Sequence, residues 1–389
     1  MRNFAAAVLL SRVMKMIWMI AFLLLPLAGL AFAGWHVWTL VPLPPLWRVL
    51  IIALGVGAFL SLFLSITRVI DSWPLPLARL VYDVSTSSIF VLLYVVMIFL
   101  ALDLLRLIRV VPASWLHHNG YTTIAITLTL FAVFVLGNIR YHHKVRAELH
   151  LTTAKQLSRP LRLVLLSDLH LGYHNPRHEL ARWVDMINRE HPDAVLIAGD
   201  IIDGSLRPLI EERMADELRR IEAPVYACLG NHEYISGEPG AEQFYREAGI
   251  TLLRDSAATL AGGDVVVIGR DDLSNRRRKP VKDLLADLRH QSEASGERPV
   301  GERFLILLDH QPYHLEKAEQ AGIDFQLSGH THRGQVWPIS WITDALYECS
   351  WGSHQRGATR YYVSSGIGIW GGKFRIGTRS EYVVMEIGD

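Results

Sequence analysis

Five short polar segments each follow a run of apolar residues in the C-terminal part of the chain. They are Ser167-Asp168-Leu169-His170, Gly199-Asp200-Ile201-Ile202-Asp203, Gly230-Asn231-His232-Glu233, Asp309-His310 and Gly329-His330-Thr331-His332. The apolar runs are short and continuous, as in strands that are buried on both faces of a sheet. The polar segments would then lie where strands end and loops gather. This placement brings carboxylates, an asparagine and histidines into one site.

Strand-like and helix-like segments alternate from residue 161 onward. Apolar runs predict strands at 161–166, 194–198, 225–229, 264–268, 304–308, 325–327, 361–364 and 381–387. Apolar residues at helical spacing predict helices at 178–190 and 209–221. This alternation predicts an α/β domain with buried strands.

The two parts of the chain differ in charge. Residues 1–150 hold 11 Lys/Arg and 4 Asp/Glu, a net charge of +7, whereas residues 151–389 hold 28 Lys/Arg and 34 Asp/Glu, a net charge of −6. Non-specific nucleic-acid binding depends on basic surfaces, so we expect no nucleic-acid partner. The run Arg276-Arg277-Arg278-Lys279 is the local exception, and we expect it to be a solvated loop.

Four apolar stretches are long enough to cross a bilayer, which requires about 20 apolar residues. They cover residues 17–38, 48–66, 84–102 and 121–139. The first stretch has the alternative of being a signal peptide, but three further stretches follow it and no small-residue cleavage site stands out. We therefore predict a four-span transmembrane region at 1–140, a polar connector at 141–160 and a soluble domain at 161–389.

Positive charges beside the predicted spans indicate the orientation, because cytoplasmic flanks carry an excess of Lys and Arg. One side holds Arg2, Arg12, Lys15, Arg68, Arg79, Arg140, Lys144 and Arg146. The other side holds Arg48, Arg106 and Arg109. We expect a multi-pass protein of an inner or plasma membrane, with both termini and the soluble domain in the cytoplasm.

The polar segments contain the donor types that bind transition metals. Each segment by itself has an ordinary alternative, a turn residue or a structurally hydrogen-bonded histidine, but all five at strand ends favour a metal site. Imidazole and carboxylate donors suit Mn, Fe, Zn or Ni better than Ca or Mg. A carboxylate with donors on both sides indicates two ions, about 3.5–4 Å apart, which activate water and stabilise phosphoryl oxygens.

The five segments, in this order, resemble the calcineurin-like metallophosphoesterase superfamily over residues 161–389. The resemblance implies a four-layer α/β/β/α sandwich of two mixed sheets, here preceded by four transmembrane helices. It implies two sets of metal ligands: Asp168, His170, Asp200 and His332 for one ion, and Asn231, His310 and His330 for the other, with Asp200 bridging. Two divalent transition-metal ions are expected, and manganese is favoured.

The same resemblance implies two catalytic residues. His232 would contact the phosphate and assist the leaving group. Asp203 would orient a histidine, and a purely structural role is the alternative.

A finer resemblance, to a membrane-associated bacterial branch, rests on residues 167–172, Asp309-His310-Gln311-Pro312, residues 328–335, and the glycine-rich 366–372 followed by Arg375. It implies a membrane-anchored phosphoesterase that hydrolyses a phosphodiester or pyrophosphate bond, with substrates that include lipid-linked molecules such as UDP-diacylglucosamine. Arg333 departs from the small residues common at its position, and it either binds substrate phosphate or caps the site.

Two other functions stay open from the sequence. One is a phosphatase that acts on soluble nucleotides or phosphoproteins, and the other is a membrane sensor or scaffold whose phosphatase-like domain does not turn over substrate. The segment 336–360 carries Trp337, Trp341, Tyr347 and Trp351, which suit a membrane interface or an apolar substrate wall. A flap packed on the domain itself is the alternative. The physiological substrate and the oligomeric state do not follow from the sequence.

Overall fold

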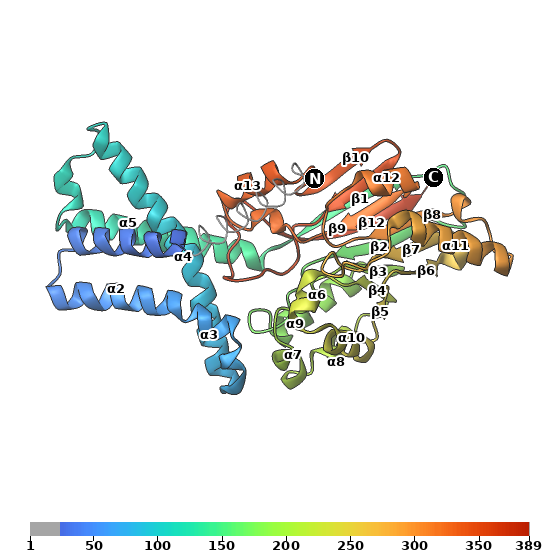
Figure 1. Cartoon of the computed structure of the whole chain (residues 1–389), viewed down its shortest axis with the longest axis horizontal. Helices are drawn as coiled ribbons and strands as arrows, with labels where there is room; N and C mark the ends of the chain where they lie inside the picture. The colour runs from blue at the N-terminus through green and yellow to red at the C-terminus, as the bar shows by residue number, and fades with distance from the viewer. Residues whose placement is uncertain (1–23, 389) are drawn as a thin grey trace, which may run out of the picture. The chain divides into compact units, whose positions relative to one another are not determined.

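The computed structural model describes residues 24–388. The chain divides into two compact units, drawn in Figure 1. One comprises the residues up to Ile70 together with Leu80–Phe134. The other comprises Asp71–Arg79 together with the chain from Val135 onward. The short segment Asp71–Arg79 therefore belongs with the C-terminal unit, although it lies between two apolar helices.

The N-terminal part is helical. Its helices are Leu24–Leu40, α2 (Pro45–Leu60), α3 (Leu62–Ile66), η1 (Val69–Ser72), α4 (Leu75–Leu107), η2 (Ala113–Leu116) and α5 (Gly120–His142). Three described segments are long and apolar enough to cross a membrane: Pro45–Ile66, Leu75–Leu107 and Gly120–His142. They contain the second, third and fourth predicted spans and indicate membrane association. The first predicted span lies partly outside the described residues, and its remainder falls in the shorter helix Leu24–Leu40.

The C-terminal unit contains two six-stranded mixed sheets. The first has the order β1-β12-β2-β3-β4-β5 and the second the order β10-β11-β9-β8-β7-β6. The strands are β1 (Lys144–Thr152), β2 (Leu161–Leu166), β3 (Ala194–Ala198), β4 (Val225–Cys228), β5 (Thr251–Leu252), β6 (Ser256–Leu260), β7 (Val265–Gly269), β8 (Phe304–Leu308), β9 (Phe325–Ser328), β10 (Gly352–Arg356), β11 (Thr359–Val363) and β12 (Ser380–Gly388). The pairs β2–β3, β3–β4, β7–β8 and β8–β9 are parallel. All eight predicted strands are present.

The helices of the C-terminal unit are α6 (Arg177–Asn188), α7 (Arg207–Glu211), α8 (Met214–Leu218), α9 (Asn231–Ser236), α10 (Glu238–Glu247), α11 (Val281–Ser295), α12 (Glu316–Ala321) and α13 (Ile339–Leu346). Short 3-10 turns are η3 (Ala261–Gly263), η4 (Val300–Glu302) and η5 (His332–Gly334). The predicted helix at 178–190 is confirmed as α6.

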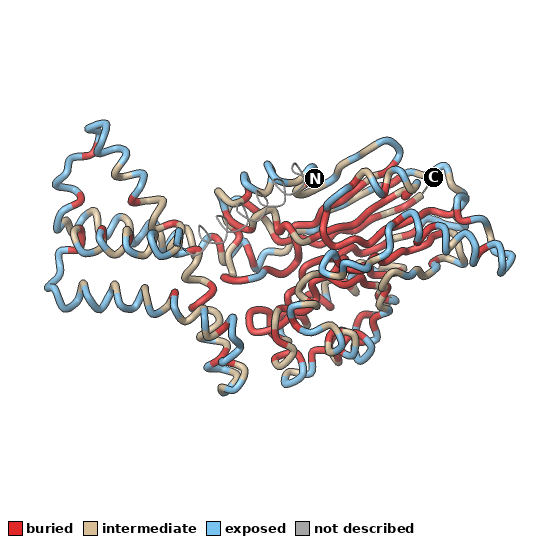
Figure 2. Tube along the Cα trace, viewed as in Figure 1, coloured by how far each residue is buried: buried red, intermediate tan, exposed pale blue. Residues whose placement is uncertain are grey.

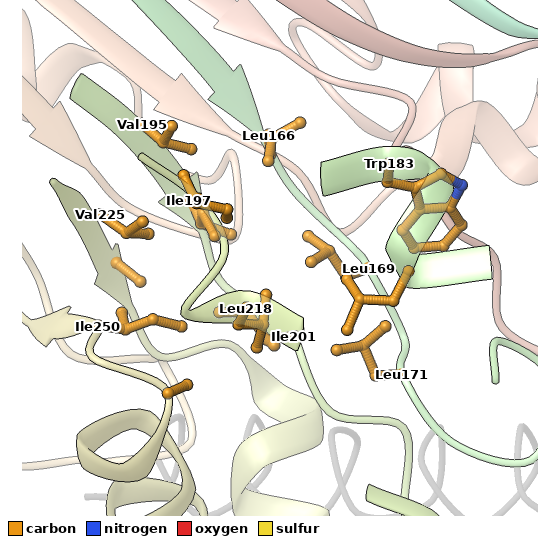
Figure 3. Packing of buried hydrophobic residues seen from close by; sticks show 14 of the residues in the cluster. Leu166, Leu169, Leu171, Trp183, Val195, Ile197, Ile201, Leu218, Val225 and Ile250 are labelled. Atoms are coloured by element: carbon orange, nitrogen blue, oxygen red, sulfur yellow. The ribbon is translucent and has the colours of Figure 1, made fainter. Parts of the chain in front are cut away.

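Side chains that alternate along the strands build the layers. On β2, Leu163 and Leu165 enter a cluster with Ile306 and Leu327 of the second sheet, so the two sheets pack face to face. Val164 of β2 instead enters a cluster with α6, α8 and α10. Figure 2 shows the buried strands, and Figure 3 shows Trp183 of α6 near Leu169 in the outer cluster.

The outer face of the second sheet packs on α11 and α12. The four-layer α/β/β/α sandwich is confirmed.

Two local expectations were wrong. The predicted connector at 141–160 contains β1, which pairs in parallel with β12 along its whole length. The predicted helix at 209–221 is broken into α7 and α8, because Arg213 adopts a left-handed conformation with φ of 53°. The predicted loop at 276–279 is present and is exposed at Arg276, Arg277 and Lys279. Its exception is Arg278, whose buried guanidinium lies 2.9 Å from the carboxylate of Asp309.

Candidate metal centre

The predicted site residues lie directly after the strands that precede them in sequence. Asp168 and Asp200 follow β2 and β3, and Asn231 begins α9 after β4. His310 and His330 follow β8 and β9 of the other sheet. The two sheets meet at these ends, because His310 Nδ1 lies 2.7 Å from the carbonyl oxygen of Ala198 at the end of β3.

The donor atoms of the predicted ligands lie close together. Nε2 of His170 is 3.0 Å from Nε2 of His332, which is 3.3 Å from Oδ1 of Asp168. Nδ1 of His330 is 2.8 Å from Oδ1 of Asn231. Ligand atoms bound to one ion at roughly 2.1 Å lie about 3 Å from each other, so these spacings fit donors that share an ion.

Asp200 connects the two sets of donors. Its Oδ2 atom lies 3.1 Å from Nε2 of His310 and 3.7 Å from Nε2 of His170. The backbone N–H of His232 donates to the other oxygen, Oδ1, at 2.9 Å, and this holds the carboxylate in place. One carboxylate oxygen therefore faces imidazole nitrogens on two sides.

The hydrogen bonds of His310 direct its Nε2 atom toward Asp200. With Ala198 O as acceptor, Nδ1 carries a proton, and a neutral ring then presents the lone pair of Nε2 toward Asp200. Two acceptor atoms 3.1 Å apart repel each other unless a proton or a metal ion lies between them, so this position suits a metal ion once the ring is neutral. Asp203 orients His170 in the same way, because its Oδ1 atom lies 3.3 Å from Nδ1 of His170. The Nε2 atom of a neutral His170 ring is then free to bind a metal ion.

The backbone is strained at this site. Five of the seven predicted ligands have left-handed φ angles: Asp168, His170, Asp200, His330 and His332. Such conformations are uncommon for residues with a side chain and gather at functional sites. Gly329 permits the close approach, because a Cβ atom there would lie 2.2 Å from Oδ2 of Asp168.

Asp203 joins His170 to His232. Its Oδ1 atom lies 3.2 Å from Nδ1 of His232, and the two imidazole rings meet edge to face at 4.5 Å. Burial raises the pKa of Asp203, but hydrogen bonds with the two imidazoles outweigh this and hold it well below its usual range. Asp203 is therefore ionised and fixes the orientation of both rings.

Geometry alone does not separate His232 from the ligands. Three overlapping groups of donor atoms lie within 4.8 Å of one another: Asp168, His170 and His332; His170, Asp200 and His232; and Asp200, His310 and His330. Sequence reasoning placed His232 on the substrate rather than on a metal. Its side chain is 22% exposed, whereas His170 and His310 are fully buried.

Two supporting residues received no role from the sequence. The buried carboxylate of Glu233 accepts hydrogen bonds from the backbone N–H groups of Gly230, Asp200 and Ile202 at 2.7, 3.1 and 3.0 Å. Burial raises the pKa of Glu233, and the charge of Asp200 adds to this. Glu233 is the third residue of α9, where a Glu side chain commonly caps the N-terminus of a helix. The sequence alone could therefore have indicated this structural role.

Arg375 is the second supporting residue. Its fully buried guanidinium donates to the carbonyl oxygens of His332 and Gly368 at 2.9 and 2.8 Å, and burial lowers its pKa to about 10. It ties the histidine motif to the glycine-rich segment. Arg333 instead stacks on the ring of Trp351 at 4.3 Å.

A pocket of about 380 Å³ opens over the donor cluster. Asp200, Asn231, His232, His330 and His332 form its floor. Ile339, Thr343, Tyr347 and Trp370 form part of its wall. The candidate metal ligands are thus accessible to a substrate of moderate size.

Fold and site together define a metal-dependent hydrolase domain of the α/β/β/α sandwich class. Residues 161–334 match the family model of the calcineurin-like phosphoesterases, so this part of the chain is a calcineurin-like phosphoesterase domain. These enzymes are metal-dependent phosphoric ester hydrolases with a dinuclear centre of divalent ions, and the overlapping donor groups fit such a centre.

Relatives occur in animals and bacteria. A transmembrane protein with a metallophosphoesterase domain from Danio rerio is 31% identical over 67% of this chain and 61% of its own length. A metallophosphoesterase of Helicobacter pylori is 28% identical over 60% of this chain and 61% of its own length. The chain thus spans about three fifths of these relatives.

Among solved structures, the 5'-nucleotidase precursor of Thermus thermophilus has a TM-score of 0.37 and 16% identity, over 54% of this chain and 50% of that one. This overlap is too slight to bear on the substrate.

Proposed function

We propose that this chain is a membrane-anchored phosphoesterase that hydrolyses a phosphodiester or pyrophosphate bond at a dinuclear centre. Asp168, His170, Asp200 and His332 hold one ion, and Asn231, His310 and His330 complete the other with Asp200 as the shared ligand. The observation that carries the proposal is Asp200 Oδ2, which faces His310 at 3.1 Å and His170 at 3.7 Å. Manganese is the favoured metal, because these donors suit the transition metals.

When bound, the two metal ions would lower the pKa of a bound water and neutralise charge on the phosphoryl oxygens. The protein residues keep the site ready for this chemistry. Backbone N–H groups of His330 and His232 hold the carboxylates of Asp168 and Asp200 at 3.0 and 2.9 Å. These hydrogen bonds hold the two carboxylates in position before a substrate binds.

His232 is the proposed acid for the leaving oxygen. Its Nδ1 atom is held by ionised Asp203, so Nε2 is the nitrogen that carries the transferable proton. The ring lines the pocket together with Asp200, His330 and His332. Asp203 is a positioning residue, because it acts through His232 and His170.

The proposed substrate class is lipid-linked, with a UDP-diacylglucosamine-like molecule as the example. Two features support this. Within residues 24–388, three helices are long and apolar enough to span a membrane, and apolar and aromatic side chains, among them Ile339, Tyr347 and Trp370, wall the pocket. We place the domain on the cytoplasmic side of an inner or plasma membrane.

The test uses the full chain, stripped of metal with a chelator and reloaded with Mn, Fe, Zn or Ni. The substrates are p-nitrophenyl phosphate, bis-p-nitrophenyl phosphate, a soluble nucleotide and UDP-diacylglucosamine. We expect metal-dependent turnover of the diester and the nucleotide-linked lipid, highest with Mn. If only monoesters or soluble nucleotides are turned over, the substrate is not lipid-linked, and the chain is a phosphatase for soluble substrates instead. If a substrate binds but is not turned over with any of the four metals, the domain is a sensor or scaffold.

A further inference from the structure

Helix α13 exposes apolar side chains beside the pocket. Trp341 is 65% exposed, Ile342 56% and Leu346 72%. Trp337, just before the helix, is 38% exposed, and its ring packs edge to face against Trp341 at 5.3 Å. We call these four residues the α13 patch. Large apolar side chains that are exposed side by side mark a candidate interaction surface.

The same helix also contributes to the pocket. Ile339 and Thr343 of α13, together with Tyr347 after its end, line the space above the metal-binding residues. These positions recur every four residues, so they form one stripe of the helix. Ile342 and Leu346 form the neighbouring stripe. Whatever covers the α13 patch therefore lies at the rim of the pocket.

The α13 patch also lies close to the end of an apolar helix. Residues 373–377 lie between Trp337 of the α13 patch and the end of α5. On one side, the backbone N–H of Arg375 donates to the carbonyl oxygen of Gly137, in the last turns of α5, at 2.9 Å. On the other side, the N–H of Trp337 donates to the carbonyl oxygen of Ile376 at 2.7 Å. One extended segment thus lies between the end of α5 and Trp337.

This end of α5 is the place where the chain leaves its apolar stretch. Gly120–His142 is long and apolar enough to span a bilayer, and Arg140 and His142 stand in its last turn. Residues Val135–His142 belong to the same compact unit as the pocket. Continuity of the chain therefore brings the lipid–water interface close to Trp337.

We propose that α13 lies in the lipid–water interface, with Trp337, Trp341, Ile342 and Leu346 against the lipid. An amphiphilic phosphoester substrate then enters the pocket over this helix while its apolar chains stay in the membrane. The proposal rests on the proposed function and adds the route by which the substrate arrives. Tryptophans beside long aliphatic side chains suit such an interface.

Charge on α13 argues for apolar contact rather than attraction to anionic lipid. Residues 339–347 contain no Lys or Arg, and the one charged residue, Asp344, is acidic and exposed. Interfacial helices that depend on anionic lipid carry basic residues on their polar face. Vesicles of neutral phosphatidylcholine are therefore the appropriate membrane for a test.

The first test places a fluorophore on the α13 patch of the full chain in phosphatidylcholine vesicles. The fluorophore is attached to Leu346→Cys. Labelling of the two native cysteines should be low, because Cys228 and Cys349 are buried. The matched control is Glu293→Cys, an exposed position on α11. Figure 1 shows α11 at the opposite end of the domain from α13. A lipid-borne nitroxide quencher and aqueous iodide report which phase surrounds each label.

We expect the nitroxide lipid to quench the label at 346 at least twofold more than the label at 293, with iodide showing the reverse. Equal iodide quenching at both sites would place the α13 patch in water and overturn the proposal. Protection of residue 346 from both quenchers would also overturn it, because protein, such as a second copy of the chain, would then cover the patch.

The second test compares two substrates. The double variant Trp341→Ser with Leu346→Ser should lose about tenfold in turnover of a vesicle-borne phosphodiester and retain turnover of soluble bis-p-nitrophenyl phosphate. Leu273→Ser, at another exposed apolar residue, should change neither. Equal losses on both substrates would mean a structural role and overturn the proposal. If the wild-type chain cleaves neither, the proposed function fails, while the quenching experiment still decides where α13 lies.

Discussion

The hydroxyl of Tyr173 donates a hydrogen bond of 2.6 Å to the carboxylate of Asp71. Tyr173 lies three residues after His170, whereas Asp71 lies between the apolar helices α3 and α4. Ser205, two residues after Asp203, donates to the second oxygen of Asp71 at 2.9 Å. A residue from between two candidate membrane spans thus holds the loops that follow two metal-site segments.

Arg79 strengthens this connection. Its guanidinium donates to the carbonyl oxygen of Tyr173 at 3.0 Å and to the carboxylate of Glu212 at 2.7 Å. The apolar helices were expected to act as an anchor. The segment Asp71–Arg79 also contributes side chains to the unit that contains the metal site.

Replacing Asp71 with Ala removes both of its hydrogen bonds. Each hydrogen bond to a charged group contributes about 1.5–3 kcal/mol, and partial loosening of the two loops should lower turnover roughly tenfold. Steady-state rates of the full chain measure this. Asp185→Asn, an exposed carboxylate paired with Arg220, serves as the control. Wild-type rates in Asp71→Ala would show that the contact has no influence on the site.

Replacing Asp200 with Asn should disturb both ions at once. The amide keeps the shape of the side chain but lacks the charge that His170 and His310 face from two sides. We expect metal content to fall from two ions per chain to less than one, measured by elemental analysis of the purified chain. Asp193→Asn, a carboxylate paired with Arg159 at the surface, should keep both ions. Full metal content with full activity in Asp200→Asn would exclude a shared ligand.

Replacing His232 with Ala should preserve the metals and abolish most turnover. A positioned acid–base group contributes roughly 10²–10⁴-fold to a rate, and the loss should grow as the leaving group becomes more basic. Rates over a series of substituted phenyl esters, with metal content measured in parallel, test this. His178→Ala alters an exposed histidine and is the control. Loss of metal in His232→Ala would make His232 a ligand instead.

Asp271 should contribute stability that depends on pH. Burial raises its pKa, but hydrogen bonds from Asn275, Tyr234 and Arg254 outweigh burial and lower it. A carboxyl with a lowered folded-state pKa stabilises the fold above the unfolded value of about 3.9 and loses this contribution as pH falls below it. Asp271→Asn should therefore lower the unfolding temperature at pH 7, by an amount that shrinks below about pH 4.

The unfolding temperature of the full chain in detergent, measured between pH 3 and 8, tests this prediction. The expected loss at pH 7 corresponds to about 2 kcal/mol, as for one hydrogen bond to a charged group. Asp287→Asn, an exposed carboxylate paired with Lys279, is the control and should show no such trend. A difference that is constant over the whole range would argue against a pKa effect.

A reporter fused after Asp389 tests the predicted orientation. Eight Lys/Arg residues flank the spans on one side and three on the other, so the positive-inside tendency predicts a cytoplasmic C-terminus. A reporter that is active only in the cytoplasm should be active in this fusion. Activity of a periplasmic or extracellular reporter instead would reverse the orientation and require a different number of spans.

Strands with unbroken apolar runs were predictable from the sequence. β2, β3 and β8 have the expected bounds, because strands covered on both faces require apolar residues at every position. β1 was missed, although Val145, Ala147, Leu149 and Leu151 alternate with polar residues. Its partner β12 begins at Ser380, and no local pattern predicts a pairing between segments so far apart.

Helix boundaries depended on contacts that the sequence does not display. The apolar spacing at 209–221 is helical throughout, yet Arg213 takes a left-handed conformation and separates α7 from α8. Within 336–360, α13 forms where a connector was expected, and Trp351 donates to Glu381 at 2.8 Å rather than facing outward with Trp341. These outcomes reflect tertiary packing, which overrides weak local preference.

The amino-acid sequence by itself determined which residues are candidate metal donors and that they stand at strand ends, because donor chemistry and apolar runs are local properties. Tertiary structure alone decided which of these donor atoms lie close together and which side chains support them. Asp203 holds both His170 and His232, and Asp71 reaches Tyr173. Each of these contacts joins segments far apart in the chain, so it exists only after the two sheets and their loops have packed together.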